Sequence, residues 1–298
     1  MKETINYYYN VYPDEIVEIN NGCYFYYGEF KYYFVKVKNI DELNMLLDIS
    51  NTLYKKNTFV DTFIFSKDKS IYVSLLEENY VLLRVNSVEN DVYSLSDIVY
   101  FNSLYVKDNI KEIPYDKIWA KNVDVFESEV SELNNDYMIV QDSFNYYVGL
   151  AENAISYYVD VKEKESLNDI RVSVCHKRIN KYMYSGLINN PLYFMLDYEV
   201  RDIALYIETM FFEGVFNFEE IIDCIKGFNR TMARILICRL LYPVYYFDQL
   251  KLVLMGKESE NSLLKYIEKC KEYELLLSDL LNYFNKKLNI PKIEWLQK

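Results

Sequence analysis

The chain has 298 residues, 51% of them hydrophobic and 26% charged, a balance that is typical of a globular protein and excludes a wholly disordered chain. Lys and Arg number 33 against 45 Asp and Glu, and the formal charge of −12 argues against a general nucleic-acid-binding protein, whose affinity depends on neutralising phosphates. No apolar stretch approaches the roughly 18 residues of a membrane span, and the N-terminus lacks the apolar core of a signal peptide, so we expect a cytoplasmic protein.

The cysteines argue against a structural role for disulfides or metals. The five cysteines stand at wide spacings without a C-x-x-C pair, and the chain has one histidine. This pattern is not that of a disulfide framework or of a Cys/His metal site. We expect reduced, buried thiols that act as small hydrophobic side chains.

Up to about residue 86 the pattern predicts a small antiparallel sheet with one inserted helix. Aromatic and β-branched residues over Cys23–Tyr27 and Phe30–Val37 flank a short turn, which is typical of a β-hairpin. Apolar residues at three-and-four spacing predict a helix over Asp41–Lys55, with Asp41 as its N-cap. Three further strands are expected over residues 58–65, 70–76 and 80–85.

From about residue 87 the pattern becomes mainly helical. Helices are predicted over residues 119–133, 144–159, 203–212, 218–225, 232–242 and 262–284. Between them, residues 171–202 hold two short apolar pieces that predict a hairpin. The sequence therefore predicts an α+β fold, with a β-rich lobe at residues 1–86 and a mainly helical lobe at residues 87–298.

Four segments carry a resemblance to a known superfamily. They are, in chain order, Tyr146–Ile155, Val174–Ile179, Arg201–Ala204 and Arg239–Phe247. Their order and sequences resemble the spore-coat-associated branch of the aminoglycoside phosphotransferase and choline kinase superfamily, over most of the chain. The resemblance implies a bilobal, protein-kinase-like fold and, in active members, phosphoryl transfer from ATP with Mg²⁺.

The resemblance first implies a phosphate-binding turn and a lysine on the third strand. Here the turn Asn20–Gly22 offers a single glycine, which makes a poor phosphate cradle. Lys36 would occupy the strand position, and Glu42 on the next helix would be its partner, so that both would bind a nucleotide cofactor. The alternative is a solvated lysine and a glutamate that the helix dipole favours in a first turn.

The catalytic loop of the superfamily is His-Gly-Asp, followed after four residues by Asn. Aligning His176 with the histidine places Lys177 at the glycine, Arg178 at the aspartate and Met183 at the asparagine. Arginine stays protonated and cannot act as a base, and a hard divalent cation requires oxygen ligands rather than a thioether. We expect no catalytic residue in this loop, and we expect His176 to hold the loop by hydrogen bonds to backbone carbonyls.

The metal-binding aspartate has one candidate. Asp197 lies 21 residues after His176, close to the separation that the resemblance implies. If Asp202 is instead the aspartate of the family's Asp-Leu-Ala segment, the metal ligand is lost, and loss is the interpretation that we favour. We expect Asp202 to be the N-cap of the helix that begins at Ile203.

These observations predict a pseudokinase, which keeps the kinase scaffold without phosphoryl transfer and binds no cofactor. The resemblance implies protein partners of the spore coat or of spore development, and deposition on the coat as an alternative to a purely cytoplasmic location. The alternative function is an active small-molecule kinase that uses ATP, Mg²⁺ and Asp197.

Tyrosine is the most unusual feature of the composition, with 32 residues. Many lie in the small lobe, including Tyr7–Tyr9, Tyr26–Tyr27 and Tyr32–Tyr33. About half of the tyrosines in alternating strands face away from the core. They would form an exposed aromatic patch, which marks an interaction site, unless helices or the C-terminal segment cover them. A codon bias of an AT-rich genome is the alternative explanation of the tyrosine content.

Overall fold

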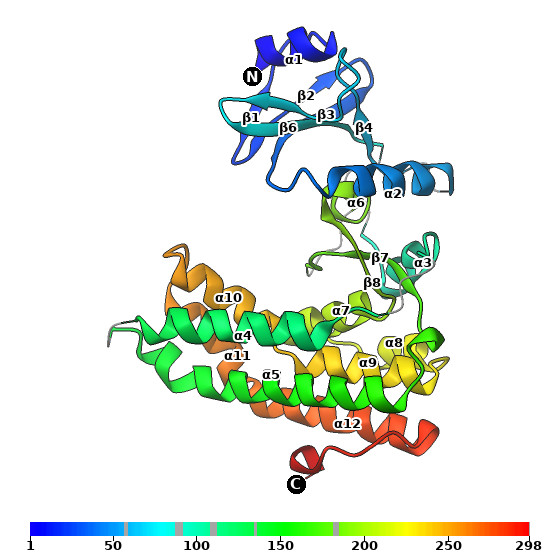
Figure 1. Ribbon diagram of the computed structural model, residues 1–298, viewed down its shortest axis with the longest axis vertical. Coiled ribbons are helices and arrows are strands. Elements are labelled where there is room, and N and C mark those ends of the chain that lie inside the picture. Colours follow the sequence, from blue (N-terminus) through cyan, green and yellow to red (C-terminus); the bar gives the residue numbers. More distant parts are fainter. Residues whose placement is uncertain (57–58, 87–91, 108–111, 134–135, 181–184, 298) are drawn as a thin grey trace. The chain divides into compact units, whose positions relative to one another are not determined.

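The computed structural model describes residues 1–56, 59–86, 92–107, 112–133, 136–180 and 185–297, and its elements are labelled in Figure 1. The chain forms two compact units, which we describe separately. Unit 1 comprises Met1–Val106, Ser173–Arg178 and Tyr182–Leu196, and unit 2 comprises Lys107–Val172, Ile179–Lys181 and Asp197–Lys298. The two units share the hairpin of residues 171–202, whereas the sequence-based division near residue 86 assigns it to the helical lobe.

Unit 1 contains an antiparallel sheet with the strand order β1-β2-β3-β6-β4, and β5 also pairs with β6. The strands are β1 (Val17–Ile19), β2 (Gly22–Tyr27), β3 (Phe30–Val37), β4 (Thr62–Ile64), β5 (Val73–Leu75) and β6 (Glu78–Arg84). Its helices are α1 (Lys2–Tyr9), α2 (Leu43–Lys56), α3 (Leu95–Ser103) and α6 (Ser185–Ile188), with a 3-10 turn at Pro191–Tyr193. The predicted antiparallel sheet with an inserted helix is confirmed, while α1 and α3 are additions to it.

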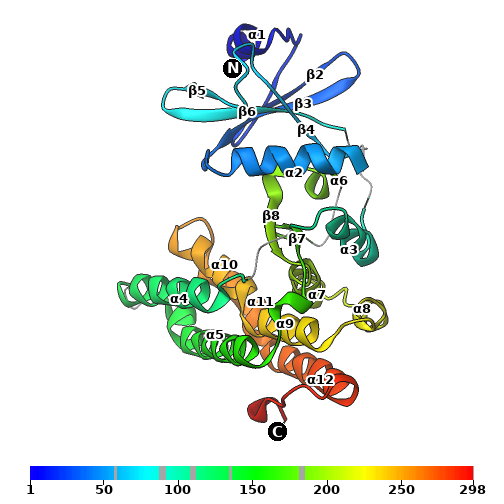
Figure 2. The same cartoon turned by 45° about the vertical axis from the view of Figure 1, so that its right-hand side comes forward.

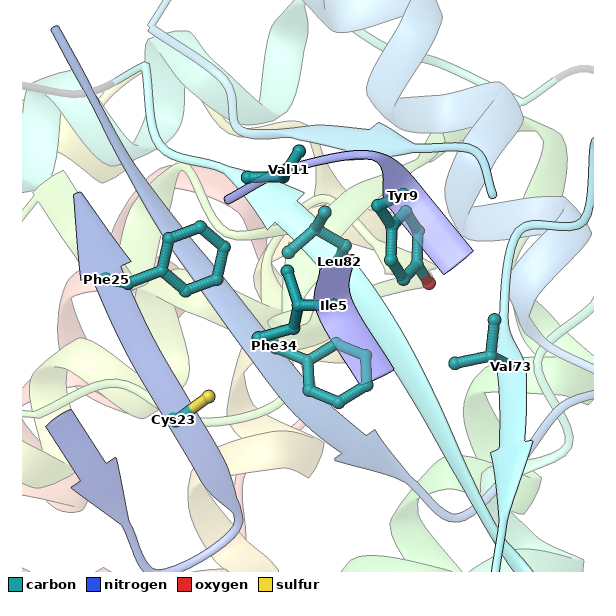
Figure 3. Packing of buried hydrophobic residues seen from close by; sticks show 8 residues of the cluster. All are labelled: Ile5, Tyr9, Val11, Cys23, Phe25, Phe34, Val73 and Leu82. Carbon is teal, nitrogen blue, oxygen red and sulfur yellow. The ribbon is translucent and has the colours of Figure 1, made fainter. Parts of the chain in front are cut away.

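Helix α1 completes the core on one face of this sheet. Figure 3 shows Phe25 and Phe34 packed with Leu82 of β6 against Ile5 and Tyr9 of α1. These side chains are buried, and burying each large apolar side chain contributes about 1.5–3 kcal/mol. The N-terminal helix is therefore part of the fold of unit 1.

Helix α2 lies on the other side of the sheet from α1, as Figure 2 shows. Its buried apolar residues recur at three-and-four spacing, at Leu43, Leu46, Ile49 and Leu53. The helix begins two residues later than predicted. The side chain of Asn39 accepts a hydrogen bond from the Asp41 backbone N–H at 3.1 Å and donates to the Glu42 carboxylate at 2.9 Å. Asp41 thus lies in the turn before α2 and is not its N-cap.

Gly22, the single glycine of the predicted phosphate-binding turn, has a role in the sheet. Its φ is 153°, and a Cβ atom there would lie 2.1 Å from the carbonyl oxygen of Phe34 and 2.9 Å from Cα of Val35. Any larger residue would push β2 away from β3 at the point where Gly22 pairs with Val35. The close approach of two strands therefore explains this glycine without a bound phosphate.

Unit 2 is helical, as predicted. Its main helices are α4 (Tyr115–Ser131), α5 (Met138–Lys164), α7 (Arg201–Phe212), α8 (Phe218–Ile225), α9 (Arg230–Leu241), α10 (Val244–Leu254) and α12 (Cys270–Leu288), with a short α11 (Leu264–Glu268). Helix α9 is buried along most of its length and packs against α5, α7 and α12. The predicted helix over residues 262–284 is divided at Lys269, and α10, which begins directly after Pro243, was not expected.

A two-stranded sheet of β7 (Val172–His176) and β8 (Phe194–Tyr198) confirms the predicted hairpin. The predicted catalytic loop starts at the end of β7, and this end lies beside the start of β8. There the backbone N–H of Lys177 donates a hydrogen bond to the carbonyl of Tyr193 at 2.8 Å. No helix in the described part of the chain is both long enough and apolar enough to cross a bilayer.

Candidate functional site

His176 closes β7 inside unit 1 and has structural neighbours. Its ring lies against Phe101 of α3 and Phe194 of β8, with centroid separations of 5.4 and 5.8 Å. Its Nε2 atom is 3.1 Å from the carbonyl oxygen of Ile188 in α6. This contact with a backbone carbonyl is of the kind expected from the sequence, and it joins β7 to α6.

The two residues after His176 place positive charge where the superfamily has glycine and aspartate. The ammonium group of Lys177 lies 3.2 Å from the carboxylate of Glu42, immediately before α2. Arg178 is exposed, and its guanidinium donates to the carbonyl of Lys177 at 2.6 Å. Met183 lies outside the described residues. Glu42, which was expected to pair with Lys36 at a nucleotide site, thus pairs with Lys177 of the loop.

Lys36 does not pair with Glu42, which corrects the expectation from the sequence. Paired residues of an antiparallel sheet project to the same face, and Lys36 pairs with Tyr80, which packs against the α1 cluster. On that face the ammonium group of Lys36 forms an ion pair with Glu78. Val37, its neighbour, projects to the opposite face because side chains alternate along a strand.

A cavity of about 620 Å³ lies in unit 1 between β3, the start of α2 and the segment 186–193. The side chains that border it include Tyr33, Val35, Leu46, Leu187 and Leu192, which are apolar or aromatic. Lys36 also borders the cavity, although its ammonium group pairs with Glu78. Lys177 and Glu42 also border the cavity, and their charges neutralise each other in an ion pair.

Asp197, the candidate metal ligand, belongs to unit 2 and is 2% exposed. Its Oδ1 atom accepts hydrogen bonds from the Tyr115 hydroxyl and from the Tyr198 backbone N–H, the second at 2.7 Å. Its Oδ2 atom lies 2.8 Å from Nη1 of Arg201 and 3.8 Å from Nη1 of Arg239. We call Asp197, Tyr115, Arg201 and Arg239 the Asp197 cluster.

The electrostatics of the Asp197 cluster are those of a buried ion network. Burial and the negative charge of Asp197 hold the pKa of Tyr115 well above its usual value of 10, so its hydroxyl stays a hydrogen-bond donor. The guanidinium of Arg239 also lies 5.1 Å from the ring centroid of Tyr115. Two positive side chains therefore surround one carboxylate whose two oxygens both have partners.

The Asp197 cluster does not fit a bound Mg²⁺ ion. This cation requires several oxygen ligands in near-octahedral geometry, and it would meet two guanidinium groups in place of a second carboxylate. In the described part of the chain, no group of three His, Cys, Asp or Glu side chains is placed to hold a metal ion. The arrangement neutralises the charge of Asp197 and surrounds it with positive side chains, which disfavours a second cation at this carboxylate.

Asp202 also differs from its expected role. Helix α7 begins at Arg201 with Val200 as N-cap, so Asp202 lies within the first turn, and it is buried. An acidic residue in a first turn is stabilised by the helix dipole without acting as a cap.

The partners of Asp197 are not predicted by the sequence pattern. Arg201 follows it by four residues, a local spacing that would have indicated a pair had the start of α7 been placed correctly. Tyr115 and Arg239 come from α4 and α9, far away along the chain, and no local pattern indicates them.

Comparisons with known proteins agree with this architecture. A sequence model described as the spore coat putative kinase YutH family matches residues 2–280. The endospore coat-associated protein YutH of Bacillus subtilis (strain 168) is 27% identical over 293 residues, which cover 86% of this chain and 86% of the relative. The resemblance to the spore-coat-associated branch is thereby confirmed.

Two solved structures show the same fold at low sequence identity. The aminoglycoside phosphotransferase from Alicyclobacillus acidocaldarius subsp. acidocaldarius DSM 446 has a TM-score of 0.62 and 11% identity, over 92% of this chain and 93% of that one. Spectinomycin phosphotransferase APH(9)-Ia, in complex with ADP and spectinomycin, has a TM-score of 0.58 and 12% identity, over 91% and 92% of the two chains. The predicted aminoglycoside phosphotransferase-like fold is confirmed.

Proposed function

Because the chain belongs to the spore coat putative kinase YutH family, we propose that it is a catalytically inactive kinase-like protein that serves as a structural or interaction component of the spore coat. The observation that carries the proposal is the state of Asp197. Its carboxylate is buried, accepts hydrogen bonds from Tyr115 and Arg201 and lies beside Arg239, where an active phosphotransferase needs a carboxylate that is available to a metal ion.

The loop after β7 supports the same conclusion. Phosphoryl transfer by kinases uses an aspartate to accept the proton of the substrate hydroxyl, and the aligned position holds Arg178, which is exposed and protonated. Lys177 at the glycine position carries a long side chain that pairs with Glu42. The position of the proton acceptor holds Arg178, the candidate metal ligand Asp197 pairs with arginines, and the strand lysine Lys36 pairs with Glu78. Each of these arrangements is better suited to a structural scaffold than to catalysis.

We expect the purified protein to bind no Mg²⁺–ATP. A ligand at 100 times its dissociation constant would add about 2.7 kcal/mol to the free energy of unfolding, which a thermal shift detects. With millimolar ATP and Mg²⁺ the melting temperature should stay unchanged, and ATP consumption should stay at background against hydroxylated and amino-sugar acceptors.

Two variants make this measurement decisive. Asp197→Asn removes the charge of the candidate metal ligand, and Glu127→Gln, at an exposed position on α4, is the matched control. Turnover by the unaltered protein would defeat the pseudokinase proposal. If Asp197→Asn abolishes that turnover while its circular dichroism shows a folded protein, and Glu127→Gln retains it, the chain is an active small-molecule kinase that uses Asp197.

The proposed coat role has its own test. In sporulating cells of the source organism, a fluorescent fusion of this chain should collect around the developing spore, because a coat component is retained by its assembly partners. Free fluorescent protein from the same promoter is the control. A fusion that stays diffuse throughout sporulation, with unaltered spores after deletion of the gene, would contradict the coat role.

A further inference from the structure

Strand β1 is an edge of the sheet in unit 1, and all three of its residues are exposed. In the described part of the chain it pairs with β2 alone, so its other edge presents backbone groups to which another strand can add. Natural edge strands are commonly protected by shortness, charged side chains, proline or a bulge. Strand β1 is three residues long and carries Glu18, so it is protected against acidic and neutral strands but not against a basic one.

An aromatic surface continues from this edge across the sheet. The register places Val17 beside Tyr24 and Tyr24 beside Tyr33, and paired residues share a face. Val17 is 46% exposed, Ile19 37% and Tyr26 58%. Figure 3 shows that α1 packs on the other face, with Phe25 and Phe34. Helix α2 lies on the same side of the sheet as the tyrosines and contacts β4, so Tyr24 and Tyr33 are half-buried while Val17 and Tyr26 at the β1 end are exposed.

The rings of this surface are held in place by a positive side chain. The ammonium group of Lys31 lies 4.4 Å from the ring centroid of Tyr24 and 5.1 Å from that of Tyr33. Such cation–π contacts fix the orientation of rings and reduce the entropy that a partner must remove on binding. We call Val17, Ile19, Tyr24, Tyr26 and Tyr33 the tyrosine face.

Apart from Lys31 over the rings, the charged side chains in the segment that contains β1 are acidic. Residues 3–30 contain no Lys, Arg or His, and they contain Glu3, Asp14, Glu15, Glu18 and Glu29. Asp14, Glu15, Glu18 and Glu29 are exposed. This stretch would repel an acidic partner and attract a basic one during encounter.

We propose that the open edge of β1 and the tyrosine face form a docking site for a basic, extended segment of a partner protein, which adds to the sheet as a further strand. Backbone hydrogen bonds along β1 supply affinity, and every second side chain of the segment lies on Val17 and Ile19. Its Lys or Arg side chains pair with Asp14, Glu15 and Glu18. The inference rests on the proposed interaction role but does not depend on the loss of catalysis.

The probe is a blocked eight-residue peptide in which valine alternates with lysine or arginine, carrying a fluorescent label. We expect its anisotropy to rise with added protein, and hydrogen exchange at the amide groups of β1 to slow in the complex. A second peptide of identical charge carries N-methyl groups on every internal amide, so neither of its edges can donate strand hydrogen bonds. It should bind at least tenfold more weakly, as should a peptide with glutamate in place of the basic residues.

Matched protein variants separate docking from general charge attraction. The double variant Glu15→Lys/Glu18→Lys should weaken binding of the basic peptide at least tenfold. The control Glu127→Lys/Glu129→Lys, with the same charge change at exposed positions on α4, should change it less than twofold.

Equal weakening by both double variants, or equal binding of the N-methylated peptide, would overturn the docking site and leave only non-specific attraction to an acidic protein. Neither result bears on ATP turnover, so failure of this inference and failure of the pseudokinase proposal are distinguishable.

Discussion

Replacing Arg234 by methionine is expected to lower the free energy of unfolding by about 1.5–3 kcal/mol, because the buried charge-assisted hydrogen bonds of Arg234 are lost while Glu165 keeps Arg230 and Asp160 keeps Lys164 as partners. Arg234 lies on α9 with a fully buried side chain. Its Nη1 is 2.8 Å from Oε1 of Glu165, and its Nη2 donates to Asp160. The pair joins α9 to the C-terminal end of α5, two helices of the packed interior of unit 2.

A neighbouring arginine provides the control. Arg230 also contacts Glu165, at 2.7 Å, but its side chain is 38% exposed. A partly exposed ion pair contributes about 0–1 kcal/mol. Arg230 also donates to the backbone carbonyls of Leu288 and Asn289, so Arg230→Met should cost less than Arg234→Met but more than the ion pair alone. Chemical denaturation of both variants measures the difference, and equal losses would show that burial of Arg234 does not set the strength of this contact.

The ion pairs of Glu165 with Arg234 and Arg230 make the free energy of unfolding depend on pH in a predictable direction. Burial raises the pKa of Glu165, but hydrogen bonds from Arg234 and Arg230 outweigh burial and hold the pKa below its usual value of 4.5. A carboxyl group with a lowered pKa in the folded state contributes stability above pH 4.5 and loses it as the pH falls through the folded pKa. Arg234→Met should therefore flatten the loss of stability on the acid side.

The parts of the fold that were predicted correctly depend on local patterns. The hairpin of β2 and β3 follows from alternating aromatic residues around one short turn, and α8 follows from an amphipathic stretch that begins after the N-cap Asn217. Helix α1 was missed because eight residues with only Ile5 and Tyr9 buried give no periodic signal. Its burial comes from the sheet, which is a tertiary effect.

In the candidate site, too, local sequence patterns do not show which residues the tertiary structure brings together. Aligning the loop at His176 identified Lys177 and Arg178 without structural knowledge, because that inference concerns residue types. The partner of Lys36 depends on which face of β3 packs against α1, and this is decided by the whole sheet. A sequence pattern marks candidate groups, but the pairs that they form depend on the packing of distant segments.

Asp197→Ala is expected to lower the free energy of unfolding by about 3–5 kcal/mol, since the guanidinium groups of Arg201 and Arg239 would remain buried without their shared carboxylate. The Tyr115 hydroxyl would also lose its acceptor. The matched control is Asp223→Ala in the exposed pair with Lys226 on α8, which should change stability by less than about 1 kcal/mol.

This variant separates a structural carboxylate from a functional one. Carboxylates kept for catalysis are commonly held at a cost to stability, so their removal is often neutral or stabilising. A carboxylate that neutralises two buried arginines is required by the fold itself. In a double-mutant cycle with Arg201→Met, the two losses should be strongly non-additive, because each substitution removes the same ion pair.

One outcome of the double-mutant cycle would refute the structural role of Asp197. If Asp197→Ala leaves the denaturation midpoint unchanged or raises it, the arginines do not depend on this carboxylate. The coupling with Arg201→Met would then be near zero, and Asp197 would be available to a cation. If both single variants lose stability and the double variant loses little more than either, Asp197 and Arg201 stabilise the fold as one buried ion pair, which is the structural role.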